Sequence, residues 1–460
     1  MKQPNVIFIL IDDMGWTDLG CYGSSFYETP HLDRLAHQGM RFTDGYAACP
    51  VCSPTRASIM TGKYPATVQI TNFIAGAANG RLLSAPYLHY LPHEEKTIAR
   101  ALGEQGYTTW HVGKWHLGDQ PYWPQHHGFD VNVGGWSAGM PRSYFSPYQN
   151  PMLPDGPDGE YLTDRLTTEA IRLIRDRGSK PFFLNLCYYA VHIPIQSKPQ
   201  LIEKYATKAA AFGLHKRDPF LIGEPYPVMH KKGGRVTRRL FQSDAAYAAM
   251  VQTLDENIGR ILKTLDDEGI ADDTVVIFTS DNGGLATSEG SPTCNAPLAE
   301  GKGWMYEGGT REPLIIRYPR LVRPDSLCTV PVTSPDFYPT LLELAGLDPM
   351  PDQHTDGASF ASLLGGAEAL DREAIFWHYP HYSNQGGGPG CSVRAGDWKL
   401  IEFFEDRRVE LYHLRDDVSE DHDLATAQPD TIARLRPMLH RWLDHVGARI
   451  PEPNPDYEEG

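Results

Sequence analysis

The sequence predicts an α/β protein, with a large, mostly parallel β-sheet flanked by helices and a smaller C-terminal α+β domain built on a short antiparallel sheet. Short apolar runs alternate with helix-periodic segments over most of the chain, as in βαβ units. After about residue 371 this pattern gives way to short strands and one closing helix. We therefore predict two domains, residues 1–365 and 366–460.

Five apolar runs are the predicted strands of the large sheet. They are nearly continuous in hydrophobicity, as expected of parallel strands that helices cover on both faces. In chain order the runs are 6–11, 107–112, 182–187, 274–279 and 314–316.

Helical periodicity marks two further segments of the first domain. Apolar residues recur at three- and four-residue spacing over 247–265, which predicts an amphipathic helix that ends at Gly269. Another helix is predicted over 337–347. In the C-terminal domain, 393–401 and 409–412 predict an antiparallel hairpin and 431–446 a closing helix, while the glycine-rich stretch 386–390 predicts a mobile loop.

Composition and charge exclude several classes of protein. The 460 residues are 41% hydrophobic, enough for a large core, and a net charge of −16 argues against a nucleic-acid backbone as partner. The longest apolar stretch near the start is 6–11, so neither a membrane span nor a secretory signal is predicted. Seven scattered cysteines do not form a disulfide framework. We expect a cytoplasmic protein, or a periplasmic or secreted one if a signal has been removed.

Polar side chains follow four of the predicted strands at the point where each strand ends. In open α/β sheets, ligands bind at the carboxyl ends of the strands, so these side chains are expected to converge on one site. In chain order they are Asp12 and Asp13, then His111, Lys114 and His116, then His192, and last Asp281 with Asn282.

Three carboxylates and one carboxamide at a single site predict a hard metal cation. Oxygen ligands of this kind suit Ca²⁺ or Mg²⁺ better than zinc. Two other interpretations stay open at this point. The Asp12-Asp13 pair is also typical of a loop cap, and Asp281-Asn282-Gly283-Gly284 is also typical of a plain turn.

The run Cys52-Ser53-Pro54-Thr55-Arg56, continued to Gly62, resembles the signature of the type I sulfatases. In that family a Cys-x-Pro-x-Arg core directs oxidation of the cysteine to formylglycine. Met60 stands where the family usually has leucine, a swap that conserves volume. The resemblance implies an alkaline-phosphatase-like fold and extends through 5–13, 113–118, 190–192, 280–283, 302–311 and 411–424.

The resemblance also implies a role for each candidate residue. Asp12, Asp13, Asp281, Asn282 and the modified Cys52 would bind the metal, which is Ca²⁺ or, as the alternative, Mg²⁺. Arg56, Lys114 and Lys302 would hold the hydrated formylglycine and the sulfate, where negative charge builds during the reaction. His192 would protonate the departing alcohol, and His116 would take a proton from the second hydroxyl, which expels sulfate and restores the aldehyde.

The resemblance further implies a formylglycine-generating enzyme as a partner and a sulfated sugar, such as a glycosaminoglycan or algal saccharide, as the substrate of an exo-acting enzyme. His378, His381 and Arg394, near the glycine-rich stretch, are predicted to reach the pocket from the C-terminal domain and contact substrate. One alternative is a phosphonate monoester hydrolase or phosphodiesterase of the same superfamily, which Asn282 argues against because those enzymes place histidine there. The other is a catalytically silent carbohydrate-binding homologue.

Overall fold

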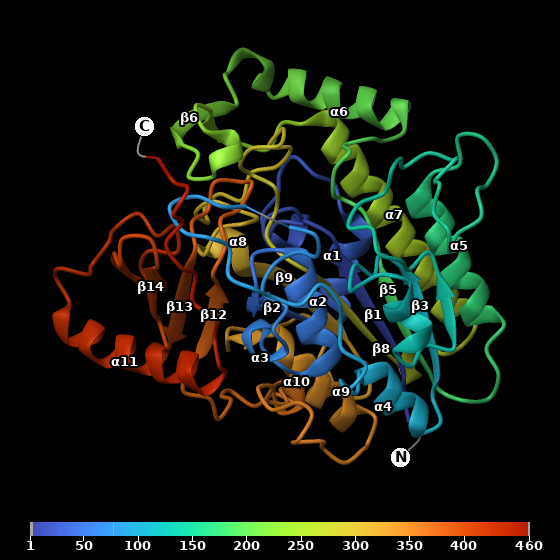
Figure 1. Ribbon diagram of the computed structural model, residues 1–460. Helices are drawn as coiled ribbons and strands as arrows, with labels where there is room; N and C mark the ends of the chain where they lie inside the picture. Colours follow the sequence, from blue (N-terminus) through green and yellow to red (C-terminus); the bar gives the residue numbers. More distant parts are fainter. Residues whose placement is uncertain (1–2, 77, 459–460) are drawn as a thin grey trace.

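The computed structural model describes residues 3–76 and 78–458, and its centre is one large sheet (Figure 1). The strands lie in the order β10-β2-β9-β8-β1-β5-β3-β4, and β11 pairs with β2. Among these described strands, β9 alone runs antiparallel to its neighbours. The bounds are β1 Asn5–Ile11, β2 Met40–Tyr46, β3 Thr108–Gly113, β4 Val131–Val133, β5 Phe182–Cys187, β8 Thr274–Ser280, β9 Arg311–Arg317, β10 Ser326–Cys328 and β11 Val332–Thr333.

The predicted mostly parallel sheet is confirmed, and all five apolar runs are strands. The run 314–316 belongs to β9, which pairs antiparallel with β8 and with β2. The strand β2 was not predicted, because its sequence MRFTDGY has no continuous apolar run. It is nevertheless largely buried, since β9 and β10 lie on either side of it.

Helices cover both faces of the sheet, and the alternation of side chains along β1 shows the two layers. Ile7, Ile9 and Ile11 pack in one core with α1 (Pro30–Gln38), α5 (Leu162–Arg175) and α7 (Ala245–Asp267). Val6, Phe8 and Leu10 pack in the other core with α2 (Cys52–Thr61), α4 (Ile98–Glu104), α9 (Phe337–Leu344) and α10 (Ala361–Leu364). Both predicted helices of this domain are therefore present, as α7 and α9.

The C-terminal region forms a second, four-stranded antiparallel sheet in the order β12-β13-β14-β15. Its strands are β12 Ile375–Tyr379, β13 Gly390–Ala395, β14 Trp398–Phe403 and β15 Val409–His413. The helix α11 (Pro429–His445) packs on one face through Leu435 and Leu439. The other face carries Trp377 and packs against Val51, the residue before Cys52. The second sheet thus supports the segment that leads into α2.

One detail of the predicted hairpin is wrong. The stretch 393–401 is two strands rather than one, because the chain reverses at Gly396 and pairs Ala395 with Trp398. Gly396 has a φ of 61°, which glycine adopts without steric cost. The domain boundary at residue 365 stays a prediction.

Four further elements differ in exposure. The helices α3 (Pro65–Val68) and α8 (Glu307–Thr310) are buried, whereas α6 (Pro199–Ala211) and the hairpin of β6 (Phe220–Pro225) and β7 (Arg235–Arg239) lie largely at the surface. Figure 1 places α6 and β6 together at one edge of the molecule. Over residues 3–76 and 78–458, no helix has the length and apolar character that crossing a bilayer requires.

Candidate active site

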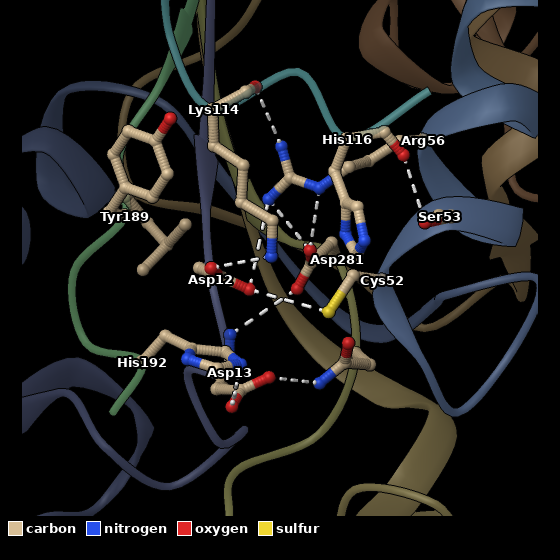
Figure 2. Close-up of polar contacts among 12 residues, drawn as sticks. Asp12, Asp13, Cys52, Ser53, Arg56, Lys114, His116, Tyr189, His192 and Asp281 are labelled. Carbon is tan, nitrogen blue, oxygen red and sulfur yellow. Dashed lines mark hydrogen bonds and ion pairs between the residues drawn. The ribbon is translucent and has the colours of Figure 1, made fainter. Parts of the chain in front are cut away.

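The ends of three strands of the large sheet and the start of one helix meet at one edge of that sheet (Figure 2). Asp12 and Asp13 follow β1, and Asp281 follows β8. Lys114 follows β3, and Cys52 begins α2. Because β8, β1, β5 and β3 are parallel neighbours, their carboxyl ends open at the same edge. The structure therefore brings the predicted strand-end residues together, except for His111, whose ring contacts Asn185 instead.

Cys52 occupies the first position of α2, after the extended residue Val51. Pro54 fits in this first turn, where the backbone N–H groups have no partner within the helix. The Cys52 side chain is buried, and its Sγ lies 3.6 Å from Oδ1 of Asp12. Burial raises the pKa of the thiol to about 12, so the unmodified cysteine is protonated at neutral pH and is a poor nucleophile.

Each of the three buried carboxylates at this edge has a cationic partner. Lys114 Nζ lies 2.7 Å from Asp12 Oδ2, and Lys302 Nζ lies 2.8 Å from Asp13 Oδ2. Arg56 Nε donates to Asp281 Oδ2 at 2.8 Å. These three carboxylates and three cations, which we call the catalytic-edge cluster, balance one another in formal charge.

The two carboxylates that follow β1 differ in their electrostatic balance. Burial raises the pKa of Asp12 to about 8, although the Lys114 ammonium group lowers it. Burial also acts to raise the pKa of Asp13, but the charge of Lys302 and the neighbouring cations more than offsets this and holds the pKa below its usual range. At Asp12, therefore, the neighbouring cations of the protein do not offset the rise in pKa that burial causes.

The donor set at this edge fits a hard cation. Asn282 Nδ2 donates to Asp13 Oδ1 at 2.8 Å, while the buried Oδ1 of Asn282 has no hydrogen-bond partner. Leaving such an oxygen unpaired costs about 1–3 kcal/mol, which a metal ion at this position would offset. Ligand atoms of Asp12, Asp13, Cys52 and His192 all lie within 4.8 Å of one another. Asp281, a predicted ligand, is turned toward Arg56 and accepts from the backbone N–H of Asp13 at 3.3 Å.

The two predicted histidines flank Cys52 in different hydrogen-bonding states. His192 Nδ1 lies 2.9 Å from the carbonyl oxygen of Ile193, and Nε2 lies 2.9 Å from Lys302 Nζ. His116 Nε2 lies 3.3 Å from the carbonyl oxygen of Ile74, and its buried Nδ1 has no partner. Burial lowers the pKa of His192 to about 3 and that of His116 well below its usual value. Both rings are therefore neutral in this arrangement.

Gly139 leaves the space that the His116 ring occupies. A Cβ atom at residue 139 would lie 2.4 Å from Cε1 of His116, closer than van der Waals contact allows. The His116 backbone itself has a φ of 58°, in the left-handed region. No sequence pattern indicates this role, because Gly139 lies in an irregular loop outside the recognised motifs.

A cavity of about 280 Å³ opens over Cys52. His116, His192 and Lys302 line it, together with residues that the sequence did not single out. Those additional lining residues are Val51, Phe73, Ile74, Ala75, Gly139, Met140, Ile193, Glu289, Asn384 and Gln385. Arg56 and Lys114 lie behind Cys52, outside this lining, and contact the carboxylates instead.

A sequence model of the sulfatase family matches residues 4–347. The chain belongs to the sulfatase family. A second model, of the C-terminal region of N-sulphoglucosamine sulphohydrolase, matches residues 300–448. Membership makes the chain a sulfuric ester hydrolase with the alkaline-phosphatase-like fold, and it implies a divalent metal and formylglycine at the cluster around Cys52.

Relatives and solved structures agree with this assignment. The chain is 32% identical to a sulfatase of Formosa agariphila, over 96% of this chain and 89% of the relative. It is 33% identical to human N-acetylgalactosamine-6-sulfatase, over 82% of this chain and 68% of the relative. The crystal structure of Ps i-CgsB in complex with k-i-k-neocarrahexaose matches with a TM-score of 0.77 and 27% identity, over 96% of this chain and 93% of that chain.

The structure does not bring His378, His381 or Arg394 into the pocket of this sulfatase. His378 Nε2 lies 3.0 Å from the carbonyl oxygen of Arg449, and His381 lies between the hydroxyls of Thr71 and Ser84. Arg394 Nη1 contacts Asp44 at 2.6 Å. The register of the small sheet sets the directions of His378 and Arg394, and His381 follows just after β12; the sequence pattern did not reveal this register. Their expected contact with substrate is therefore corrected to a structural role.

The C-terminal domain reaches the pocket through a different segment, the turn 383–387. Asn384 and Gln385 line the cavity. Gly387 donates its backbone N–H to Ser383 Oγ at 2.9 Å, and Ser383 donates its own to the Gly387 carbonyl oxygen at 2.9 Å. The glycine-rich stretch expected to be a mobile loop thus begins as a hydrogen-bonded turn.

Proposed function

We propose that this sulfatase removes a sulfate group from the end of a saccharide chain, with residue 52 as formylglycine and Ca²⁺, or Mg²⁺, at the catalytic edge. The observation that carries the proposal is that Cys52, Lys302, His116 and His192 line one cavity, with the carboxylates directly behind them. A cavity of about 280 Å³ lies at the lower end of small-molecule pockets, which suits one sugar ring. The relative named N-acetylgalactosamine-6-sulfatase and the solved complex with k-i-k-neocarrahexaose support a sugar substrate.

The oxidised residue 52 and the metal would together supply the nucleophile. Formylglycine carries an aldehyde whose hydrate provides an attacking oxygen, and a cation held by Asp12, Asp13, Asp281 and Asn282 would acidify it. A formylglycine-generating enzyme would be needed to oxidise Cys52 before the enzyme acts. These roles rest on the family resemblance and on the donor set described above.

The cations of the site have separate tasks. Lys302 lines the cavity and places its ammonium group where sulfate oxygens would lie, so it stabilises the negative charge that builds there. Lys114 and Arg56 hold Asp12 and Asp281 in place from behind. The Lys302 ammonium also donates to His192, which links charge stabilisation with proton transfer.

The hydrogen bonds of the two histidines suit opposite proton transfers. His192 Nδ1 is held by the Ile193 carbonyl oxygen, so Nε2 is the nitrogen left to carry a proton to the departing alcohol oxygen, once the ring has been protonated and Nε2 has left its contact with Lys302. His116 donates Nε2–H to Ile74 and keeps Nδ1 without a partner, so Nδ1 can accept a proton from the second hydroxyl on residue 52. We assign His192 as the acid and His116 as the base on this basis.

Parallel turnover of 4-nitrophenyl sulfate and bis(4-nitrophenyl) phosphate tests the proposal. We expect faster cleavage of the sulfate ester and release of inorganic sulfate from sulfated hexoses. Faster phosphodiester cleavage would instead favour a phosphonate monoester hydrolase or phosphodiesterase. A solved structure of a phosphonate monoester hydrolase shares the fold, with a TM-score of 0.65 and 22% identity, so the fold alone does not decide between them. Failure to cleave either ester, by correctly modified protein, would contradict the proposal and favour a silent homologue.

A further inference from the structure

The cavity over Cys52 has a lining of two chemical kinds. Phe73, Ile74, Met140 and Ile193 supply apolar surface. Glu289, Asn384 and Gln385 supply a carboxylate and two carboxamides, and we call these three residues the polar wall. A sugar ring has apolar C–H faces and hydroxyl groups at its edge, so a cavity with both kinds of lining matches such a ring. The polar wall is not part of the catalytic-edge cluster.

Glu289 lies in a strained turn, residues 288–291, whose backbone conformation depends on contacts with neighbouring segments. Ser288, Glu289 and Ser291 have φ values of 57°, 46° and 40°, all in the left-handed region. Non-glycine residues held there cost about 1 kcal/mol or more each, and such strain persists where neighbouring structure fixes it, often at ligand sites.

The fixing structure is β7, through the backbone of Thr237. The carbonyl oxygen of Thr237 accepts from Ser288 N at 2.8 Å and from Ser291 Oγ at 3.1 Å. Ser291 N also donates to the Ser288 carbonyl oxygen at 2.7 Å, which closes the turn. The exposed Glu289 side chain is therefore held at the cavity by a rigid backbone.

The turn 383–387 of the C-terminal domain completes the polar wall. Gln385 Nε2 donates to Glu289 Oε2 at 2.6 Å. The Gln385 carbonyl oxygen accepts from Ser288 Oγ at 3.3 Å and from Trp304 Nε1 at 3.2 Å. Trp304 lies two residues after Lys302, so the same contacts tie the polar wall to the segment that carries the sulfate-facing lysine.

We propose that Glu289, oriented by Gln385, selects sugars that carry one sulfate group and neutral hydroxyl groups, and rejects sugars with a second anionic group on the same ring. The carboxylate accepts hydrogen bonds from hydroxyl groups, whereas a second sulfate or a carboxylate placed against it meets like charge. The net charge of −16 on the whole chain acts in the same direction, against densely anionic saccharides. This inference rests on the proposed function, because it names the class of sulfated sugar that the site accepts.

The test is a ratio of kcat/KM values for two substrates that differ by one sulfate group. Purified, formylglycine-containing protein is assayed on 4-nitrophenyl sulfate, on each monosulfate of galactose and N-acetylgalactosamine, and on the corresponding disulfates. For the monosulfate that the wild type cleaves best, we expect kcat/KM to exceed that of the corresponding disulfate by about tenfold or more. The substitution Glu289→Gln keeps the shape of the side chain and should reduce this preference by about fivefold, and Glu289→Lys should reduce it further. Glu203→Gln, which removes an exposed carboxylate on α6, is the matched control and should leave the ratio unchanged.

The outcomes separate this inference from the proposed function. An unchanged ratio in both Glu289 variants, with activity retained, would overturn the selective role of Glu289 and leave the sulfatase assignment intact. An equal loss on every substrate, the aryl ester included, would place Glu289 in the chemical step and also overturn the inference. If no sulfated sugar is cleaved while the aryl sulfate is, the proposed saccharide substrate fails, and the inference fails with it.

Discussion

Two buried clusters in this sulfatase have the same charge composition and different surroundings. The catalytic-edge cluster contains Asp12, Asp13 and Asp281 with Arg56, Lys114 and Lys302. A second cluster, which we call the interdomain cluster, joins the large sheet to the small one. It contains Asp44, Glu307 and Glu420 with Arg311, Arg394 and Lys399.

In the interdomain cluster, each carboxylate has a cationic partner within the same cluster. Lys399 Nζ lies 2.8 Å from Glu307 Oε1 and 3.0 Å from Glu420 Oε1. Arg394 reaches across to Asp44 at 2.6 Å. Both clusters border a cavity, since Lys302 lines the one over Cys52 and Arg394 lines another of about 270 Å³. The catalytic-edge cluster differs because the unpaired amide oxygen of Asn282 and the unpaired ring nitrogen of His116 lie beside it. Charge content and a cavity therefore do not by themselves mark the site, and these two unpaired acceptors distinguish it.

The largest expected effect concerns the nucleophile. Cys52→Ala removes the only side chain that can become formylglycine in this motif, so we expect kcat to fall by about four orders of magnitude or more. Cys49→Ala is a matched control, because Cys49 is also buried, lies three residues earlier and does not line the cavity. Sulfate release from 4-nitrophenyl sulfate measures both. An active Cys52→Ala variant would remove the basis for the catalytic-edge assignment.

The next prediction compares one lysine from each cluster. Lys399→Met leaves Glu307 and Glu420 buried without their lysine, so we expect a loss of about 3–5 kcal/mol in the free energy of unfolding. Lys114→Met likewise leaves the Asp12 carboxylate buried without its lysine, but a bound divalent cation should offset the resulting loss of stability. In denaturant unfolding, added Ca²⁺ should stabilise Lys114→Met more than the wild type, and Lys399→Met no more than the wild type. An equal response of all three proteins would contradict the difference between the clusters.

A smaller effect is expected when the base is displaced without any change in charge. Gly139→Ala places a methyl group against the His116 ring, and we expect kcat to fall by about 10- to 100-fold through misplacement of the ring. Gly388→Ala is the control, because a Cβ atom there would meet nothing within 4 Å. Retained turnover in Gly139→Ala would argue against His116 as the base.

The smallest effect is a pH dependence of stability in the C-terminal domain. Burial raises the pKa of Glu402, but hydrogen bonds from Arg436 and His440 more than offset this, and the folded pKa lies below the ordinary 4.5. The contacts of ionised Glu402 with Arg436 and His440 therefore stabilise the fold above about pH 4.5, and this contribution is lost as the pH falls through the folded pKa of Glu402. Glu402→Gln should cost about 1 kcal/mol at pH 7, with the difference from the wild type vanishing at low pH. A difference that grows toward low pH would reverse the assigned sign.

The sequence predicted those parts of the molecule whose signals are local. Continuous apolar runs mark β1, β3, β5 and β8, and the parallel arrangement then places Asp12 and Asp281 at one edge. The polar wall has no such signal, since Glu289 depends on a left-handed turn held by β7 and Gln385 arrives from another domain. Arg394 illustrates the same limit, because only the fold shows that it faces Asp44 instead of the cavity.

The central claim is that residue 52 is a formylglycine when the enzyme is active. Mass spectrometry of the peptide that contains residues 52–56, taken from active protein purified from its native host, tests this directly. We predict that the peptide has the lower mass that results when an aldehyde replaces the thiol of Cys52. The fraction of the peptide with this lower mass should rise in proportion to the sulfatase activity of the sample. A fully active preparation in which residue 52 is wholly an unmodified cysteine would contradict the account.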